Sequence, residues 1–180
     1  MSSQGSFSSK VMTRASSPQT EGVSIRTATS ADITGLVRLI NVAFVAEQFV
    51  FEGARIDAKQ TQAFMDSGQF LIAESSAGLA GCVYVEIRRD RGYLGLLSVD
   101  PRYQGTGLGR KLVAAAEDYF RAAGCCAVDL RVISQRTPQP PFYRHLGYAE
   151  VGTAPFSPTL QPKVPGHYIV MSKSLGGRDR

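Results

Sequence analysis

The chain has 180 residues, a formal net charge of +5 and 43% hydrophobic residues. This length suits a single domain with a buried core, and no run of about eighteen apolar residues exists that could cross a membrane. The basic residues are scattered among acids rather than interleaved with stacking aromatics. The charge is therefore compatible with an acidic ligand, and nucleic-acid binding is the competing interpretation, which this scattered pattern does not favour.

The first 22 residues are rich in serine and lack apolar periodicity, which predicts a disordered tail. The tail is basic and has no acid before Glu21, a pattern that faintly resembles a mitochondrial transit peptide. No amphipathic helix is visible, so a plain tail or a cloning remnant is the favoured interpretation. The cysteines (Cys82, Cys125 and Cys126) form no Cys-x-x-Cys pair, which indicates reduced thiols and a cytoplasmic location. Burial is expected for Cys125 and Cys126.

A strand and two helices are predicted at the start of the ordered part. Val23–Thr27 has the pattern of a strand. Thr29 and Asp32 are suited to cap a helix whose apolar face extends to Phe44. A second short helix is predicted over Ala58–Ser67.

Three further strands follow, over Phe70–Glu74, Leu79–Arg88 and the run that ends at Val99. Turn residues separate them, so an antiparallel meander is predicted. Asp100-Pro101 stops the last strand because proline has no N–H for a ladder. A glycine loop then leads into an amphipathic helix that ends near Gly124.

The glycine loop has the properties of an anion cradle. Gly105, Gly107 and Gly109 allow the backbone close to a ligand, and the first N–H groups of the following helix have no internal partners. Arg102, Arg110 and Lys111 add positive charge. Arg110 stands where both the dinucleotide fingerprint and the P-loop require glycine, so neither motif is complete.

The last third of the chain completes the sheet. Cys126–Val132, Tyr148–Thr153 and His167–Ser172 are predicted strands, and a short helix is predicted over Phe142–Leu146. The loop Ala154–Gly166 carries four prolines, which makes it semi-rigid and able to cover a substrate mouth.

Gln104, Gly107 and Gly109 resemble the acetyl-CoA loop of the GCN5-related N-acetyltransferase (GNAT) family. The family pattern is Gln/Arg-x-x-Gly-x-Gly/Ala after a strand ending in apolar-x-Val-x-Pro, which residues 97–101 supply. Residues 142–148 resemble its Tyr-x-x-x-Gly-Phe/Tyr motif. The resemblance implies an α/β (α+β) fold with a mixed, mostly antiparallel twisted sheet of six to seven strands flanked by helices.

The resemblance implies one acetyltransferase domain over residues 23–175, followed by a tail at 176–180, and acetyl-CoA as cofactor. The implied cofactor-binding residues are Leu97, Ser98, Val99, Gln104, Gly105, Thr106, Gly107, Leu108, Gly109 and Arg110. The N–H of Leu97 would face the acetyl oxygen, which requires the strand Cys126–Val132 to diverge from its neighbour. Arg136-Thr137-Pro138 replaces an Asn that often contacts the cofactor in this family.

Tyr143 aligns with the general acid of the family, and a phenol is mostly protonated at neutral pH. Holding the cofactor sulfur without proton transfer is the alternative role. Tyr93 stands where many members carry a catalytic Glu. Glu86 on the preceding strand is the predicted replacement, directly or through water, and a surface carboxylate beside Arg88 is the alternative. Further candidates for the base are Glu47, Glu52 and Asp57.

The connection between the first two helices forms a wall of the acceptor site in this family. Phe44, Phe49, Phe51 and Arg55 are therefore candidate substrate contacts, although each phenylalanine also suits a core position. No metal-ligand spacing is present. The predicted function is direct acetyl transfer to an amine, with homodimerisation possible. The alternatives are a non-catalytic CoA-binding module and a basic nucleic-acid-binding domain.

Overall fold

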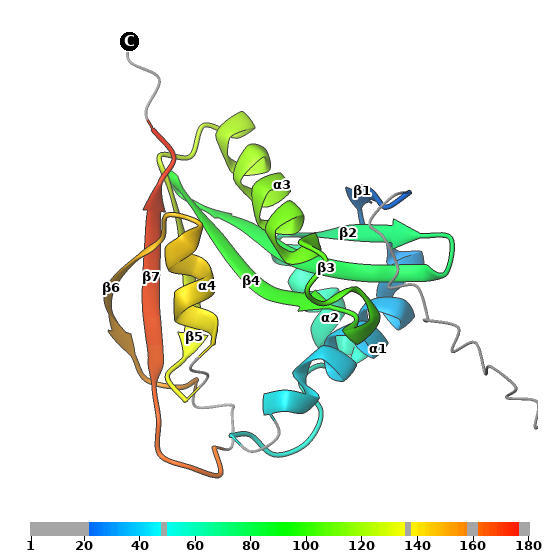
Figure 1. Ribbon diagram of the computed structural model, residues 1–180, viewed down its shortest axis with the longest axis horizontal. Coiled ribbons are helices and arrows are strands. Elements are labelled where there is room, and N and C mark those ends of the chain that lie inside the picture. The colour runs from blue at the N-terminus through cyan, green and yellow to red at the C-terminus, as the bar shows by residue number, and fades with distance from the viewer. Residues whose placement is uncertain (1–21, 48–49, 136–137, 158–161, 177–180) are drawn as a thin grey trace, which may run out of the picture.

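The computed structural model describes residues 22–47, 50–135, 138–157 and 162–176. Seven strands form one sheet in the order β1-β2-β3-β4-β5-β7-β6, with the β4–β5 pair parallel and all other pairs antiparallel (Figure 1). The strands are β1 Ser24–Thr27, β2 Gln69–Ser75, β3 Gly78–Arg88, β4 Arg91–Val99, β5 Ala127–Ile133, β6 Ala149–Ala154 and β7 Tyr168–Ser174. The predicted fold class and the meander are confirmed.

Four α-helices cover the sheet (Figure 1). They are α1 Ile33–Ala43, α2 Ala58–Ser67, α3 Leu108–Ala122 and α4 Gln139–His145, with 3-10 turns η1 Ser30–Asp32, η2 Phe44–Glu47 and η3 Pro101–Tyr103. The predicted bounds of α2 are confirmed. Asp57 caps this helix, because its carboxylate accepts a hydrogen bond from Gln60 N–H at 2.7 Å.

Alternation along β3 divides the core between the two faces of the sheet. Val83 and Val85 pack with α3 and with Tyr143 of α4, whereas Cys82 and Tyr84 pack on the other face with α1. A third cluster, of Val50, Phe51 and Ile133 with Phe156, Val164 and Tyr168, ties the α1–α2 connection to β5 and β7. The α1–α2 connection is thus held against the ends of β5 and β7.

Some sequence predictions need correction. Helix α4 begins at Gln139 rather than Phe142, because Pro140 and Pro141 fit the first turn of a helix, where an N–H is not needed. Cys125 is buried as expected, but Cys126 is exposed at the turn before β5. The predicted tail lies, up to residue 21, outside the described residues. None of the described helices is both long and apolar enough to cross a membrane.

Candidate active site

The glycine loop between β4 and α3 leaves main-chain N–H groups open at the start of a long helix. Gly105 and Gly107 have φ values of +75° and +87°, and a Cβ at either position would meet nothing within 4 Å. The first hydrogen bond of α3 runs from Lys111 N–H to the Gly107 carbonyl at 3.2 Å, so the N–H groups of residues 108–110 lack an acceptor inside the helix. The loop therefore fits the pyrophosphate of a nucleotide cofactor.

Charge at the rim of this loop comes from Arg110 and Lys111. Both side chains are exposed, and neither has an ion-pair partner among the described residues. Arg102 differs from the sequence expectation, because its guanidinium is paired with Asp100 at 2.9 Å and lowers the pKa of that carboxyl group. Arg102 therefore adds less positive charge to the loop than its position in the sequence suggests.

A bulge interrupts the pairing of β4 with β3 just before the loop. The strands pair up to Gly95 and again from Ser98, whereas Leu96 and Leu97 have no paired residue. Leu96 has a φ of +48°, which is uncommon for a residue with a Cβ. The buried Ser98 hydroxyl donates a hydrogen bond to the Leu96 carbonyl at 3.0 Å and holds this shape. The bulge takes Leu97 out of the regular ladder.

The strands β4 and β5 diverge beside the bulge. Their parallel pairing ends at Leu94 and Leu130, although β5 continues to pair with β7 as far as Ile133 and Tyr168. Within the described part of the chain, the second half of β4 therefore has no strand paired with it on its β5 side. The gap between the two strands, called the slot below, is the divergence that the predicted role of the Leu97 N–H requires.

Two cavities meet at this slot. The loop cavity, of about 450 Å³, is lined by the glycine loop and by Phe142 of α4. The cleft, of about 1350 Å³, is lined by the α1–α2 connection, the diverging strands and Tyr143. Phe44, Leu97 and Gln139 line both cavities. The molecule can therefore hold two ligands whose ends meet beside Leu97.

Comparison with known sequences identifies the family. Residues 36–148, more than half of the chain, match the profile of the acetyltransferase (GNAT) family. The chain belongs to this family. Mycothiol acetyltransferase of Saccharopolyspora erythraea is 34% identical over 137 residues, which are 73% of this chain and 45% of that protein. IAA acetyltransferase of Azospirillum brasilense is 34% identical over 92 residues, which are 50% of this chain and 59% of that protein. The chain spans less than half the length of the mycothiol acetyltransferases that it matches.

Solved GNAT structures share the fold. The ribosomal-protein-S18-alanine N-acetyltransferase of Escherichia coli superposes with a TM-score of 0.70 at 19% identity, over 88% of this chain and 98% of its own. A putative acetyltransferase of Salmonella typhimurium, solved with its cofactor acetyl-CoA, gives 0.70 at 20% identity, over 88% and 97%. Acetyl-CoA is the cofactor generally used in this family, and the open cradle at Gly105 and Gly107 fits its pyrophosphate.

Most of the cofactor residues predicted from the GNAT motif lie around the loop cavity. Those that line it are Leu97, Val99, Gln104, Gly105, Gly107, Leu108, Gly109 and Arg110. Ser98 and Thr106 are not among its lining residues. Their hydroxyls instead hold the local backbone, since Ser98 bonds to Leu96 and the Thr106 hydroxyl donates to the Tyr103 carbonyl at 2.6 Å. The predicted cofactor contacts of Ser98 and Thr106 therefore stay predictions.

Tyr143, the predicted acid, is buried and lines the cleft at the slot. Its ring packs edge-to-face against Phe142 and Tyr148, with centroids 5.0 and 5.7 Å away. Phe142 lines the loop cavity, so one short helix presents a side chain to each cavity. The role of Tyr143 as general acid stays a prediction.

Glu86, the predicted base, is not among the residues that line the cleft. Its carboxylate accepts hydrogen bonds from the Arg88 guanidinium at 2.7 and 2.9 Å and from the Tyr84 hydroxyl at 3.2 Å. The hydrogen bonds from Arg88 lower its pKa. Tyr84 does line the cleft and connects it to Glu86. A proton could therefore reach Glu86 through Tyr84 or water rather than by direct contact.

The other candidate bases have different environments. Glu52 lines the cleft and is exposed, whereas Asp57 serves as the cap of α2. The side chain of Glu47 lies outside the described residues. Glu52 is thus the one carboxylate that lines the cleft in the described part of the chain.

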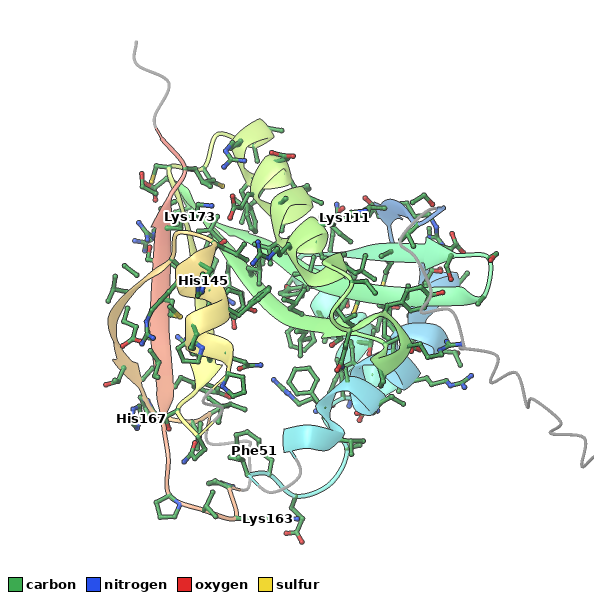
Figure 2. All side chains as sticks on the ribbon, viewed as in Figure 1. Phe51, Lys111, His145, Lys163, His167 and Lys173 are labelled. Atoms are coloured by element: carbon green, nitrogen blue, oxygen red, sulfur yellow. The ribbon has the colours of Figure 1, made fainter. Side chains whose placement is uncertain are left out.

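The predicted acceptor residues Phe44, Phe51 and Arg55 all line the cleft, whereas Phe49 lies outside the described residues. Phe51 is 8% exposed and packs edge-to-face with Phe156, with centroids 5.0 Å apart. Figure 2 shows Phe51 and Lys163 at the end of the molecule where the α1–α2 connection approaches β7. Phe51 is therefore a core residue that also lines the cleft, so its position is compatible with a substrate contact as well.

Sequence reasoning missed Asn41, Arg131 and Gln139, which also line the cleft. A signal existed for Arg131, because strict alternation in the predicted strand puts it on the face opposite the buried Leu130 and Val132. Asn41 interrupts the apolar stretch of α1, which indicates that its side chain makes hydrogen bonds. Nothing in the residue pattern marks Gln139.

Proposed function

We propose that the chain is an N-acetyltransferase that moves an acetyl group from acetyl-CoA to a primary amine by direct attack in a ternary complex. The observation that carries the proposal is the meeting of the two cavities at Phe44, Leu97 and Gln139. A donor in the loop cavity and an acceptor in the cleft would bring their reactive ends together there. We take residues 23–175 as the domain that performs this reaction.

Acetyl-CoA, when bound, supplies an acetyl group activated as a thioester. The backbone N–H groups of residues 108–110 would bind the pyrophosphate, with Arg110 adding charge. The bulge at Leu96 frees Leu97 from the strand ladder. The Leu97 N–H would then donate a hydrogen bond to the acetyl oxygen, where negative charge develops as the amine attacks.

Proton movements complete the reaction. Tyr143 would donate its phenolic proton to the departing sulfur, and the slot places this side chain on the same cleft as Leu97. The attacking amine must lose a proton, and Glu86 would accept it through Tyr84 or water, since Tyr84 joins the cleft to this carboxylate. Glu52 is the competing base because it lines the cleft itself.

Two measurements test the proposal. A thermal melt with acetyl-CoA, and with NADH and ATP as controls, should show stabilisation by acetyl-CoA alone, of about 2.7 kcal/mol at a hundredfold excess over the dissociation constant. An amine panel, followed by release of free CoA thiol, should then reveal turnover. Stabilisation without turnover on any amine would identify a CoA-binding module. No stabilisation by acetyl-CoA would contradict the cofactor assignment itself.

A further inference from the structure

The cleft contains a buried polar atom that has no partner. Among the described residues, Arg55 Nε is the one buried side-chain nitrogen or oxygen without a hydrogen-bond partner. Buried polar groups in native proteins are nearly always satisfied, and each exception needs a physical reason. The Arg55 side chain lines the cleft and has no ion-pair partner among the described residues, so an anionic ligand in the cleft is the natural partner of its guanidinium.

The backbone that carries Arg55 is firmly held. The side-chain oxygen Oδ1 of Asn41 accepts hydrogen bonds from Arg55 N–H at 2.8 Å and Ile56 N–H at 3.1 Å. The Asn41 amide donates to the Ile56 carbonyl at 2.9 Å, and the Ile56 side chain is buried. The Arg55 guanidinium lies 5.1 Å from the centroid of the Phe44 ring, which also orients it. A guanidinium on a held backbone, stacked near an aromatic ring and without an ion-pair partner among the described residues, is suited to recognise a planar anion.

The cleft as a whole has an excess of positive charge. Arg55, Arg131 and Lys163 line it and have no ion-pair partner among the described residues, while Glu52 is the one carboxylate described on its surface. The remaining cation on the cleft, Arg88, is already paired with Glu86. Arg131 reaches the cleft because β5 diverges from β4 after Leu130. Unpaired cations on both walls favour an acidic acceptor.

We propose that the acceptor is a primary amine that also carries a carboxylate, and that Arg55 binds this carboxylate with Arg131 as a second cation. This inference rests on the proposed acetyl transfer and specifies its substrate class. A guanidinium forms paired, charge-assisted hydrogen bonds with a carboxylate, which would give Arg55 the ion-pair partner that it lacks among the described residues. The aromatic rings of the cleft, including Phe44 and Phe51, would accommodate an apolar side chain on the acceptor.

The first experiment compares matched acceptors, L-phenylalanine and L-leucine against their amides. For each acceptor, the kcat/KM of the wild-type protein is divided by that of the Arg55→Gln variant. Because each ratio compares two proteins with the same acceptor, differences in amine pKa between the acids and the amides do not affect it. We expect a ratio of about tenfold or more for the acids and below about threefold for the amides, because only the acids lose a charge-assisted contact. Equal ratios for acids and amides would overturn the inference.

Further variants separate recognition from folding and from cofactor binding. Arg55→Lys should recover part of the preference for acids, since it keeps the charge but loses the planar fork. Arg131→Gln should reduce the preference by a smaller factor. Arg38→Gln is the matched control, because Arg38 is an exposed arginine of α1 that does not line the cleft. The KM for acetyl-CoA should stay unchanged in Arg55→Gln, and an increase in that KM matching the loss would assign Arg55 to the cofactor instead.

A binding measurement separates this inference from the proposed function. N-acetyl-L-phenylalanine and its amide are titrated calorimetrically into the protein saturated with CoA, which requires no turnover. We expect the acid to bind about tenfold more tightly, and the difference to disappear in Arg55→Gln. Turnover of amines with no preference for acids in either assay would overturn the inference alone. A binding preference for acids with no turnover of any amine would overturn the proposed function alone.

Discussion

The loop cavity and the cleft are built in different ways. Most of the loop cavity is made by one continuous segment, in which a strand, a glycine turn and a helix follow one another from β4 to α3, and residues of α1, η2 and α4 complete it. Its binding groups are main-chain N–H groups, and its shape depends on left-handed glycines. The cleft is assembled from side chains of the α1–α2 connection, β4, β5 and α4. One cavity is thus suited to a constant cofactor, and the other can change its specificity through single side chains.

The largest expected effect comes from placing a charged side chain in the loop cavity. Gly107→Glu should abolish acetyl-CoA binding, because the residue has a φ of +87° and the space for its side chain is the space of the phosphates. Binding is measured by the thermal shift with acetyl-CoA. Gly124→Glu is the matched control, since Gly124 has a φ of +81° and open space at the other end of α3. Loss of the thermal shift in both variants would indicate general destabilisation rather than a blocked site.

Tyr143→Phe should have the next largest effect, on the acetyl-transfer step itself. The variant keeps the ring packing against Phe142 and Tyr148 and removes the phenolic proton. We expect kcat to fall about a hundredfold with the KM for acetyl-CoA nearly unchanged. Steady-state kinetics with one saturating amine measures both. An unchanged kcat would show that another group protonates the sulfur, whereas a raised KM with little change in kcat would indicate a binding role.

The two cavities also differ in how far the sequence could predict them. The anion-binding character of the glycine loop can be predicted from the sequence, because glycines, a proline stop and a helix start are all local in the chain. The individual cofactor residues come from the family resemblance, and the lining residues Gln139 and Phe142 of α4 come from neither. Phe51 and Arg55 could be named only through family resemblance, since no local pattern shows what a connecting segment will contact. Arg131 required two facts together, strand alternation and the end of pairing at Leu130. The second fact arises from tertiary structure, so the charge of the cleft could not be seen in the sequence.

Two ion pairs near the site depend on tertiary structure in the same way. The sequence leaves open whether Glu86 is the base or a surface carboxylate beside Arg88, and the structure shows that the Arg88 guanidinium binds this carboxylate. Arg102 was likewise counted as a free cation at the loop before its pairing with Asp100 was known. Ion pairs between neighbours depend on side-chain direction, which the order of residues leaves open. Backbone features could therefore be predicted from the sequence better than the pairing of charged side chains.

Asn41→Ala tests whether the cleft depends on a fixed Arg55, and its effect should be smaller than that of Tyr143→Phe. The variant removes three hydrogen bonds that hold residues 55 and 56, so the free energy of unfolding should fall by about 1–3 kcal/mol. The kcat/KM for the acid acceptors should fall about fivefold to tenfold, while the KM for acetyl-CoA stays constant. Chemical denaturation and kinetics with both acceptor types measure these changes. Asn41→Asp keeps the acceptor oxygen, so its stability and its kcat/KM for acids should lie between those of wild type and Asn41→Ala. An equal loss of kcat/KM for acids and amides would mean that Asn41 is only structural.

Glu86→Gln should give the smallest change, because Glu86 reaches the cleft only through Tyr84 or water. Arg88 lowers the pKa of this carboxyl below its usual value of about 4.5, so Glu86 is ionised throughout the neutral range and is a weak base. Activity that depends on ionised Glu86 is lost as the pH falls through this lowered pKa. We therefore expect an acidic limb below about pH 4.5 and a loss in kcat at neutral pH of about threefold to tenfold, less than for direct proton transfer. The pH dependence of kcat in wild type, Glu86→Gln and Glu52→Gln measures this. A wild-type profile in Glu86→Gln together with a lost acidic limb in Glu52→Gln would move the base from β3 to the wall of the cleft.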